Sequence, residues 1–351
     1  MALNEDLKLD EHSLITSKLM KRHGVGSTES IDAGELRERT AELALILNLA
    51  EQGFIRKDPA EQIVHGLAGR LHLLRRKASP VVWQELIPIA QKHSVAEYLL
   101  TDPFTRWSFE KPRGYSGDAS LLDIYYKHPS ADEIVQSSPA LGRAIYGYTS
   151  EAASSVAGRE RRDILAKTVD ETAARVDGAE VLAIACGHLR EAELSTALAQ
   201  GKLKRWIGLD QDPISVGTVN RDLAGTGVEA TDGSVRGILR RAYNLGTFDL
   251  VYASGLYDYL PRAVGIRLMQ RAMELVRPGG DFLFANFSDE ITTDGYMETF
   301  MDWPLILRSA DDMWEIINAA VDRNLVDAEV YYGSNRNIVY GKVRKRATGN
   351  Q

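Results

Sequence analysis

Strands and helices alternate along the second half of this 351-residue chain, and this alternation restricts the folds open to it. From Glu180 onward, apolar segments such as EVLAIA, RWIGLD, FDLVYAS and DFLFANF are separated by segments with helical periodicity. Strands that are apolar along their whole length are typical of a parallel sheet with helices on both faces. The last two segments, DAEVYYG and NIVYGKV, are three residues apart and must pair antiparallel. The sequence therefore predicts a doubly wound, seven-stranded α/β sheet with an antiparallel last strand.

The first 140 residues have a different character. Apolar residues recur at spacings of three and four in ELRERTAELALILNLAEQGF and AEQIVHGLAGRLHLL, as in amphipathic helices. Asp58 followed by Pro59 is typical of an N-cap with proline at the first helical position, and one long helical stretch is expected over 140–176. We predict an all-helical N-terminal cap or substrate domain over residues 1–140, including the RGYSGD loop at 113–118. The α/β core is predicted over 141–351.

The composition argues against nucleic-acid and membrane partners. The net charge is −7, so the chain lacks the Lys/Arg surface that phosphate groups require, and the short basic cluster at 159–162 is expected on the solvated surface. The N-terminus lacks the apolar core of a signal peptide, and segment 41–50 is about half the length of a membrane span. We expect a cytoplasmic protein that binds neither nucleic acid nor membrane, and the sequence leaves a homodimer open.

The turn after the first strand, ACGHLRE, is the place to look for a cofactor, because ligands bind beyond the carboxyl ends of strands in doubly wound sheets. A dinucleotide fingerprint that starts at Gly187 needs glycines at 189 and 192, where Leu189 and Ala192 stand. S-adenosyl-L-methionine has no phosphate and needs instead an acidic residue for its ribose at the end of the second strand. Asp210 ends WIGLD, 23 residues after Gly187.

Several of these residues have a simpler explanation. Asp210 or Asp212 could cap the helix that begins at Pro213, and Asp232 could cap the next helix instead of contacting adenine. Cys186, the only cysteine, could act as a nucleophile, but packing beside a tight glycine turn is the simpler interpretation. His188 could act as a general base, whereas an exposed loop position is the commoner outcome for such a residue. His65 and His72, seven residues apart on one predicted helix, could share a face, but without further cysteine or carboxylate spacing they are a weak signal of a metal site, and none is predicted.

Five segments, together with RGYSGD, resemble class I S-adenosylmethionine-dependent methyltransferases: EVLAIACGHLRE, GLDQDP, FDLVYASGLYDYL, VRPGGDFLFANF and METFMDWPLILRS. More narrowly, they resemble the bacterial family in biosynthesis of an extracellular factor, 3-hydroxypalmitic acid methyl ester, over roughly residues 104–343. The resemblance implies that residues 185–191 and Asp210 hold the cofactor, that 232–234 lie near adenine, and that 254–259 face the methyl group. His188 departs from the family, which usually has a proline or another small residue there.

Methyl transfer depends mainly on bringing the acceptor atom into line with the methyl group, so the candidate residues lie on segments that gather above the strand ends. The predicted catalytic residues are Tyr115, Asn286 and Arg308. The predicted cofactor-binding residues are Arg113, Tyr115, Ala185, Gly187, Glu191, Asp210, Gln211, Asp232, Gly233, Ser234, Ser254 and Gly255. The predicted substrate-binding residues are Tyr257, Tyr296, Trp303 and Tyr332.

Some of these candidates also have structural alternatives. Tyr115 and Trp303 could pack in the core, and Arg308 could pair with Asp311 or Asp312. Asp258 could cap the helix near Pro261.

These features predict a methyltransferase that uses S-adenosyl-L-methionine on a small-molecule acceptor, most readily at an oxygen of a carboxylate or hydroxyl. Methylation of nitrogen or carbon in a specialised metabolite is a second interpretation. A non-catalytic protein that binds the cofactor, with the helical part holding a partner, is a third. An NAD-dependent oxidoreductase is the least favoured, because of Leu189 and Ala192.

Overall fold

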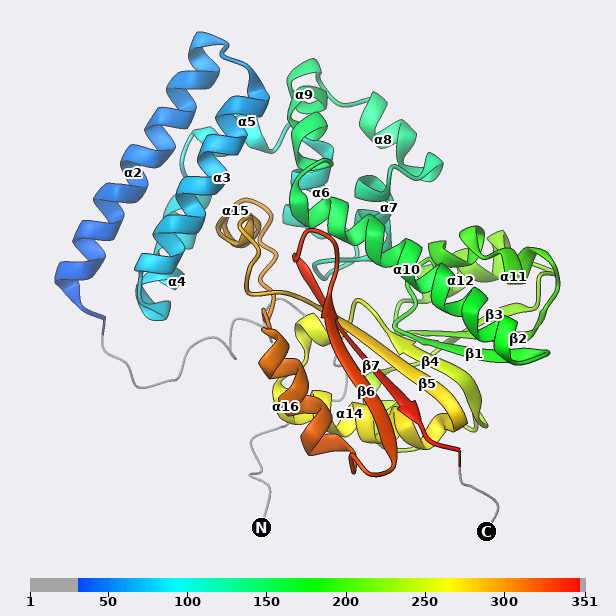
Figure 1. The fold of residues 1–351 in the computed structure, drawn as a ribbon. Helices are drawn as coiled ribbons and strands as arrows, with labels where there is room; N and C mark the ends of the chain where they lie inside the picture. Colours follow the sequence, from blue (N-terminus) through cyan, green and yellow to red (C-terminus); the bar gives the residue numbers. More distant parts are fainter. Residues whose placement is uncertain (1–30, 348–351) are drawn as a thin grey trace.

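The computed structural model describes residues 31–347, and the predictions made for the N-terminal segment lie outside these residues. From residue 31 to 178 the elements are helical, as the periodicity predicts (Figure 1). These elements are α2 (Ala33–Arg56), α3 (Ala60–Lys77), α4 (Pro80–Gln91), α5 (Val95–Leu99), α6 (Pro103–Glu110), α7 (Ala119–Tyr126), η1 (Pro129–Ala131), α8 (Asp132–Gln136), α9 (Ala140–Thr149) and α10 (Ala153–Arg175).

A seven-stranded sheet with the strand order β3-β2-β1-β4-β5-β7-β6 follows. Its strands are β1 (Ala179–Ile184), β2 (Leu203–Asp210), β3 (Val228–Asp232), β4 (Phe248–Ala253), β5 (Val276–Phe287), β6 (Val326–Tyr332) and β7 (Ile338–Lys345). The first five strands pair parallel, and β7 pairs antiparallel with both β5 and β6. The predicted doubly wound, seven-stranded sheet with an antiparallel last strand is confirmed.

The remaining helices connect these strands. They are η2 (Arg190–Leu194), α11 (Thr196–Ala199), α12 (Pro213–Asp222), α13 (Val235–Leu239), η3 (Tyr257–Tyr259), α14 (Arg262–Leu275), α15 (Asp294–Thr299) and α16 (Ala310–Ala320). Among residues 31–347, no helix is long and apolar enough to cross a membrane.

Alternate residues of the strands pack into two different apolar cores. In β1, Val181 and Ala183 join a core that contains side chains of α10 and α12, whereas Leu182 and Ile184 join a core with α14 and α16. The first core continues without interruption into the helical part, where it includes Leu43 of α2 and its neighbours. The helical part therefore shares its apolar core with one face of the sheet, and in Figure 1 α10 runs alongside the sheet while α2–α9 lie beyond the ends of its strands.

Several helix boundaries differ from the sequence prediction. The expected stretch over 140–176 is two helices, α9 and α10. The segment after the first turn forms only the short helices η2 and α11. Asp58 does not cap α3: its carboxylate accepts hydrogen bonds from Arg56, and Pro59 holds the N-cap position without a side-chain bond. The domain boundary at 140/141 stays a prediction, and α9, which begins there, packs on α3, α5 and α6.

A short helix inserted after β5 joins the core to the helical part. All residues of α15 are buried, and the helix packs on α3 and α4 (Figure 1). Asp294 is 2.7 Å from the His72 ring and 3.0 Å from the Arg75 guanidinium, which also pairs with Glu298. At Gly295 the two helices are so close that a Cβ atom would lie 2.6 Å from the backbone carbon of Leu71.

We predict that Gly295→Ala lowers the free energy of unfolding by about 1–3 kcal/mol, because the added methyl group meets backbone atoms that cannot rotate away. Urea unfolding followed by circular dichroism measures the change. Gly69→Ala on α3 is the matched control, since its Cβ would meet no atom within 4 Å. That control should be neutral or slightly stabilising. Equal stability of the two variants would contradict the close approach of α15.

A buried carboxylate, Asp102, begins α6 inside the helical part. It accepts hydrogen bonds from the backbone N–H groups of Phe104 and Thr105 and from the hydroxyls of Thr105 and Thr149. Burial raises the pKa of Asp102 to about 6, and these hydrogen bonds offset only part of the shift. Between roughly pH 4 and 6 the folded chain therefore holds a proton that the unfolded chain has released.

We predict that Asp102 lowers the free energy of unfolding by up to about 3 kcal/mol as the pH rises through this interval, because its pKa is higher in the folded state. Asp102→Asn removes the titration, and both hydroxyl partners can rotate to accept from the amide. Urea unfolding of both proteins at several pH values should show the variant gaining stability relative to the wild type from pH 4 to 6. A difference that is independent of pH would contradict the prediction.

Candidate functional site

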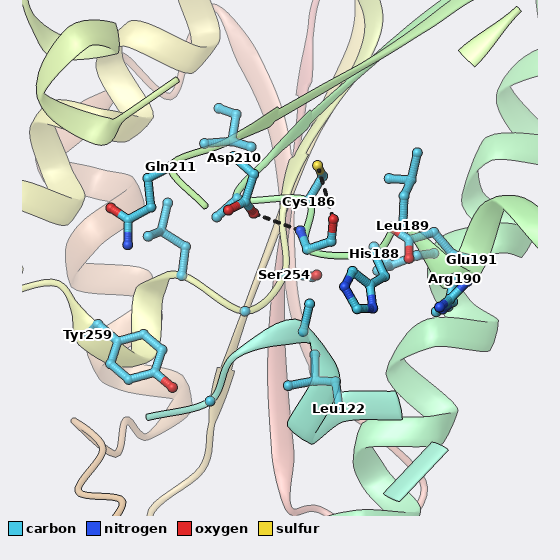
Figure 2. Close-up of a pocket in the computed structure, with 18 of the residues that line it drawn as sticks. Leu122, Cys186, His188, Leu189, Arg190, Glu191, Asp210, Gln211, Ser254 and Tyr259 are labelled. Atoms are coloured by element: carbon cyan, nitrogen blue, oxygen red, sulfur yellow. Dashed lines mark hydrogen bonds between the residues drawn. The ribbon is translucent and has the colours of Figure 1, made fainter. Parts of the chain in front are cut away.

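A cavity opens at the carboxyl ends of β1, β2 and β4, where the fold predicts a ligand site (Figure 2). It encloses about 1010 Å³, including the solvent at its mouth. From the strand side it is lined by Ile184, Ala185, Cys186, Gly187, His188, Leu189, Arg190, Glu191, Asp210, Gln211, Gly233, Ser234, Val235, Ile238, Ser254, Gly255, Leu256 and Tyr259. From the helical side it is lined by Tyr115, Ser116, Gly117, Ala119, Leu122, Asp123, Tyr126, Arg161 and Leu165.

The turn after β1 has an unusual backbone. Ala185, Gly187 and Leu189 all have left-handed conformations, with φ values of 56°, 54° and 51°. Left-handed alanine and leucine are uncommon and cost on the order of 1 kcal/mol or more each, so the surroundings must hold them in place. The Leu189 N–H closes the turn on the Cys186 carbonyl oxygen at 3.0 Å, and the Gly187 N–H donates to Asp210 at 2.7 Å (Figure 2).

Asp210 is buried at the end of β2 and connects two backbone segments. One carboxylate oxygen accepts from the Gly187 N–H and the other accepts from the Asp212 N–H at 2.9 Å. Burial raises the pKa of Asp210, and the two backbone bonds oppose that shift. Each oxygen keeps a lone pair for a further donor on the cavity side. Asp210 does not cap α12. Asp212 does, through its bond from the Ile214 N–H.

Fewer residues at the end of β3 line the cavity than the sequence predicts. Gly233 and Ser234 line the cavity, but Asp232 is exposed and does not. Asp232 also does not cap α13, because the Ser234 side chain accepts from the Gly237 N–H and fills that role. The side chain of the last residue in a strand can point to either face, and here it points to solvent.

The loop 111–118 covers the cavity and is fastened to Asp212. Arg113 donates to the Asp212 carboxylate at 2.6 Å, and the Tyr115 hydroxyl donates to the same oxygen at 3.2 Å. Tyr115 lines the cavity, whereas Arg113 does not and is held by Asp212, Ser215 and Ser120. Burial and the nearby carboxylates raise the pKa of Tyr115 above its usual range, so its hydroxyl stays protonated.

His188 is buried in the cavity wall, which corrects the expectation of an exposed loop residue. Its Nδ1 lies 2.8 Å from an Asp123 oxygen, and its Nε2 lies 3.3 Å from the Arg113 guanidinium. Arg190 binds both oxygens of Asp123 at 2.9 Å. Burial alone would raise the pKa of Asp123, but the bonds from His188 and Arg190 outweigh it and hold the pKa well below its usual range. His188 therefore has both ring nitrogens engaged.

Glu191 is buried and Cys186 is half-buried on the same wall. The Tyr252 hydroxyl donates to Glu191 at 2.6 Å, and burial raises the pKa of Glu191 despite this bond. The Cys186 sulfur packs against Gly208, where a Cβ atom would lie 2.8 Å from it. Burial, with Asp210 and Glu191 nearby, raises the pKa of the Cys186 thiol well above its usual value. The packing role is therefore favoured over a nucleophilic one.

Arg161 is a cavity residue that the sequence analysis missed. The basic cluster 159–162 was expected on the solvated surface, yet Arg161 is 4% exposed and lines the cavity. It lies on α10 on the same face as the buried Gly158, Leu165 and Val169. That helical spacing is the signal that could have placed it inward.

Two of the three predicted catalytic residues form a buried network away from the cavity lining. Arg308 donates to the carbonyl oxygens of Tyr257 and Leu260 and to the Asn286 side-chain oxygen. The Asn286 amide donates to the carbonyl oxygens of Phe287 and Ile306. Neither residue lines the cavity, and the Arg308 guanidinium donates to these three oxygens instead of the Asp311 or Asp312 carboxylate. The network fixes the segments after β4 and β5 to each other.

The four predicted substrate-binding residues do not line the cavity either. Tyr257 packs in the core of the sheet, with its hydroxyl on the Gly265 carbonyl oxygen at 3.1 Å. Tyr296 lies 3.0 Å from the Thr105 hydroxyl, and the Tyr332 hydroxyl accepts from a backbone N–H at 3.1 Å. Trp303 contacts a residue that does line the cavity: its Nε1–H donates to the Tyr259 hydroxyl at 2.8 Å.

Asp258, considered as a helix cap, accepts instead from the Phe287 N–H at 2.6 Å. Burial raises the pKa of Asp258 to about 6, and the nearby Arg161 lowers it in part. It therefore belongs to the buried polar groups between η3 and β5.

No protein-family model and no curated sequence matches the chain. Solved structures do match it. A possible exported protein from Bordetella parapertussis is 17% identical, with a TM-score of 0.53 over 91% of this chain and 100% of that chain. This likeness bears on the fold alone. The N-methyltransferase NodS from Bradyrhizobium japonicum WM9 is 14% identical, with a TM-score of 0.37 over 54% and 96% of the two chains. Magnesium protoporphyrin IX methyltransferase from Synechocystis, with bound S-adenosylmethionine, is 12% identical, with a TM-score of 0.40 over 66% and 97%.

We predict that Cys186 reacts with iodoacetamide at least about tenfold more slowly in the folded chain than in urea, because only the thiolate reacts and burial disfavours it. The reaction is followed by mass spectrometry at pH 7.5, and a single cysteine makes the mass shift unambiguous. Equal rates in the two conditions would show that the thiol is accessible and ionised.

Proposed function

We propose that this chain is a methyltransferase that binds S-adenosyl-L-methionine in the cavity above β1, β2 and β4. One observation carries the proposal: ten of the twelve cofactor residues predicted from the sequence line this single cavity, and only Arg113 and Asp232 do not. The lining also fits the group chemically. The buried Asp210 carboxylate keeps acceptor capacity for two ribose hydroxyls, and the acidic wall with Glu191 favours a sulfonium cation.

The local backbone favours this cofactor over a dinucleotide. A pyrophosphate is bound by the N-terminus of an α-helix after the first strand, where free N–H groups and the helix dipole meet the charge. Here the turn leads into the five-residue 3₁₀ helix η2, and left-handed Leu189 stands where the fingerprint needs glycine. A cofactor without phosphates does not need such a helix.

In the proposed reaction the protein acts mainly by positioning. When bound, S-adenosyl-L-methionine supplies an electrophilic methyl group. Tyr115 and Tyr126 from the helical part and Tyr259 from the strand side enclose the cavity and exclude water from the acceptor. His188 is engaged at both nitrogens, so the arrangement favours an acceptor that needs no general base.

The acceptor we propose is a small molecule methylated at oxygen, on a carboxylate or hydroxyl. N- or C-methylation remains the alternative, and a protein that binds the cofactor without turnover is the other. We also propose a cytoplasmic location, a division into cap and core near residue 140, and membership in the family of extracellular-factor biosynthesis. Tyr115 is the member of the predicted catalytic set that the geometry supports, because it lines the cavity and stays protonated.

We predict that the chain binds S-adenosylhomocysteine and that Asp210→Ala lowers the affinity about 10- to 100-fold, because the variant loses charge-assisted hydrogen bonds to the ribose. Isothermal titration calorimetry measures both affinities. Asp232→Ala is the matched control: Asp232 is the register partner of Asp210 on β3 but is exposed and outside the cavity. Its affinity should match that of the wild type.

Asp210→Asn serves as a second variant, because it keeps the shape of the side chain and one acceptor for the Gly187 and Asp212 N–H groups. A variant that melts like the wild type but binds weakly separates ligand contact from folding. Binding of NAD and not of S-adenosylhomocysteine by the wild type would refute the proposal.

A further inference from the structure

Arg161 is a buried cation with few hydrogen-bond partners. Its Nη1–H donates to the Ser254 carbonyl oxygen at 2.9 Å, at the carboxyl end of β4. The Asp258 carboxylate forms an ion pair with the same Nη1 atom at 3.9 Å, which is longer than a hydrogen bond, and the guanidinium carbon lies 5.7 Å from the centre of the Phe287 ring. A guanidinium has five N–H donors, so most of its capacity is left for other groups.

Beyond Ser254 and Asp258, the acceptors around Arg161 are neutral tyrosine hydroxyls. Tyr125, Tyr126 and Tyr340 lie around the guanidinium. The hydroxyls of Tyr125 and Tyr340 are buried and have no hydrogen-bond partner of their own. Glu191, on the same cavity wall, uses its carboxylate on the Tyr252 hydroxyl and forms no ion pair with Arg161. Unpaired buried polar groups are costly, and Arg161, which lines the cavity, has several N–H groups without an acceptor, which points to a ligand that supplies acceptor oxygens.

This inference rests on the proposed function, which adds a positively charged cofactor to the cavity. The lining already holds three carboxylates, Asp123, Glu191 and Asp210, and Asp123 is bound by a second guanidinium, Arg190. Glu191 and Asp210 are available to a sulfonium cation, whereas the remaining N–H donors of Arg161 are available to an anionic oxygen of the acceptor. The remaining walls near Arg161 are Leu122, Leu165 and the ring of Tyr126, which suit an apolar body.

We propose that Arg161 binds the anionic group of the acceptor and so selects an ionised acid over a neutral molecule of the same shape. The guanidinium holds the anion at the end of β4, at the point where Ser254 and Gly255 face the cavity. An ionised acid brings its own nucleophilic lone pair and releases no proton on methylation. Arg161 is thus a positioning and specificity residue for the acceptor. The sequence prediction places Asn286 and Arg308 at this site instead.

The test uses the full chain saturated with S-adenosylhomocysteine, and three acids as probes: benzoate, 4-phenylbutyrate and octanoate. Each acid is compared with its neutral amide by calorimetry, in the wild type and in Arg161→Met. We expect at least one acid to bind the wild type more tightly than its amide. Arg161→Met should lower the affinity for that acid about 10- to 100-fold and leave the affinity for the amide unchanged.

Arg175→Met is the matched control on the same helix. It lies away from the cavity, and its partner Asp281 keeps a second arginine, Arg344. It should bind the acids like the wild type. If Arg161→Met does not fold, Arg161→Lys decides: the charge remains but the planar fork is lost, so the preference for acid over amide should fall.

Each other outcome overturns the inference in an identifiable way. If the wild type binds S-adenosylhomocysteine but prefers no acid to its amide, or if Arg161→Met keeps the preference, Arg161 does not select the acceptor. If a folded Arg161→Met loses S-adenosylhomocysteine itself, Arg161 serves the carboxylate of the cofactor instead. If the wild type binds no S-adenosylhomocysteine, the proposed function fails together with this inference.

Discussion

The site is organised by two carboxylates at the end of β2. Asp210 accepts from the Gly187 N–H and the Asp212 N–H, which fixes the strained turn after β1 to the start of α12. Asp212 in turn caps α12 and accepts from Arg113 and Tyr115 of the covering loop. The floor and the roof of the cavity thus depend on one short, continuous set of hydrogen bonds. Two neighbouring buried carboxylates are tolerated here because their oxygens accept hydrogen bonds.

The helical part and the sheet form one structure, although their sequences look unlike. One face of the sheet and the inner faces of the cap helices share an apolar core, so neither could expose that face without loss of stability. The insertion α15 adds polar contacts to this interface, where His72 and Arg75 meet Asp294, and Trp83 donates to Glu298 at 2.6 Å. The helices next to the covering loop are therefore held both by the shared apolar core and by the polar contacts of α15.

Charge in the cavity is unevenly distributed. Asp210 and Glu191 are buried carboxylates with raised pKa values on the strand side, and Arg161 is the guanidinium on the α10 side. His188 is held between Asp123 and Arg113 and links α7 to the covering loop. Such an arrangement suits a reaction in which opposite charges are brought into contact and positioned.

The sequence by itself determined the sheet, its antiparallel last strand, the turn at Gly187 and the acid at Asp210. These features are readable because they depend on local periodicity, on the special backbone of glycine, and on the chain order of strand ends in a doubly wound sheet. The helix expected after the first turn forms only as the 3₁₀ helix η2 and the four-residue α11, since the extent of a helix depends on tertiary packing.

Only the tertiary structure decided which polar side chains face the cavity. Arg161 and His188 were expected on the surface, whereas Asn286 and Arg308 were expected in the site, and packing reversed both assignments. A charged residue can be buried only where distant segments supply partners: the Ser254 carbonyl for Arg161, Asp123 for His188, and the carbonyl oxygens after β4 for Arg308. These partners are remote along the chain, so no local pattern encodes them, and the fold alone brings them together.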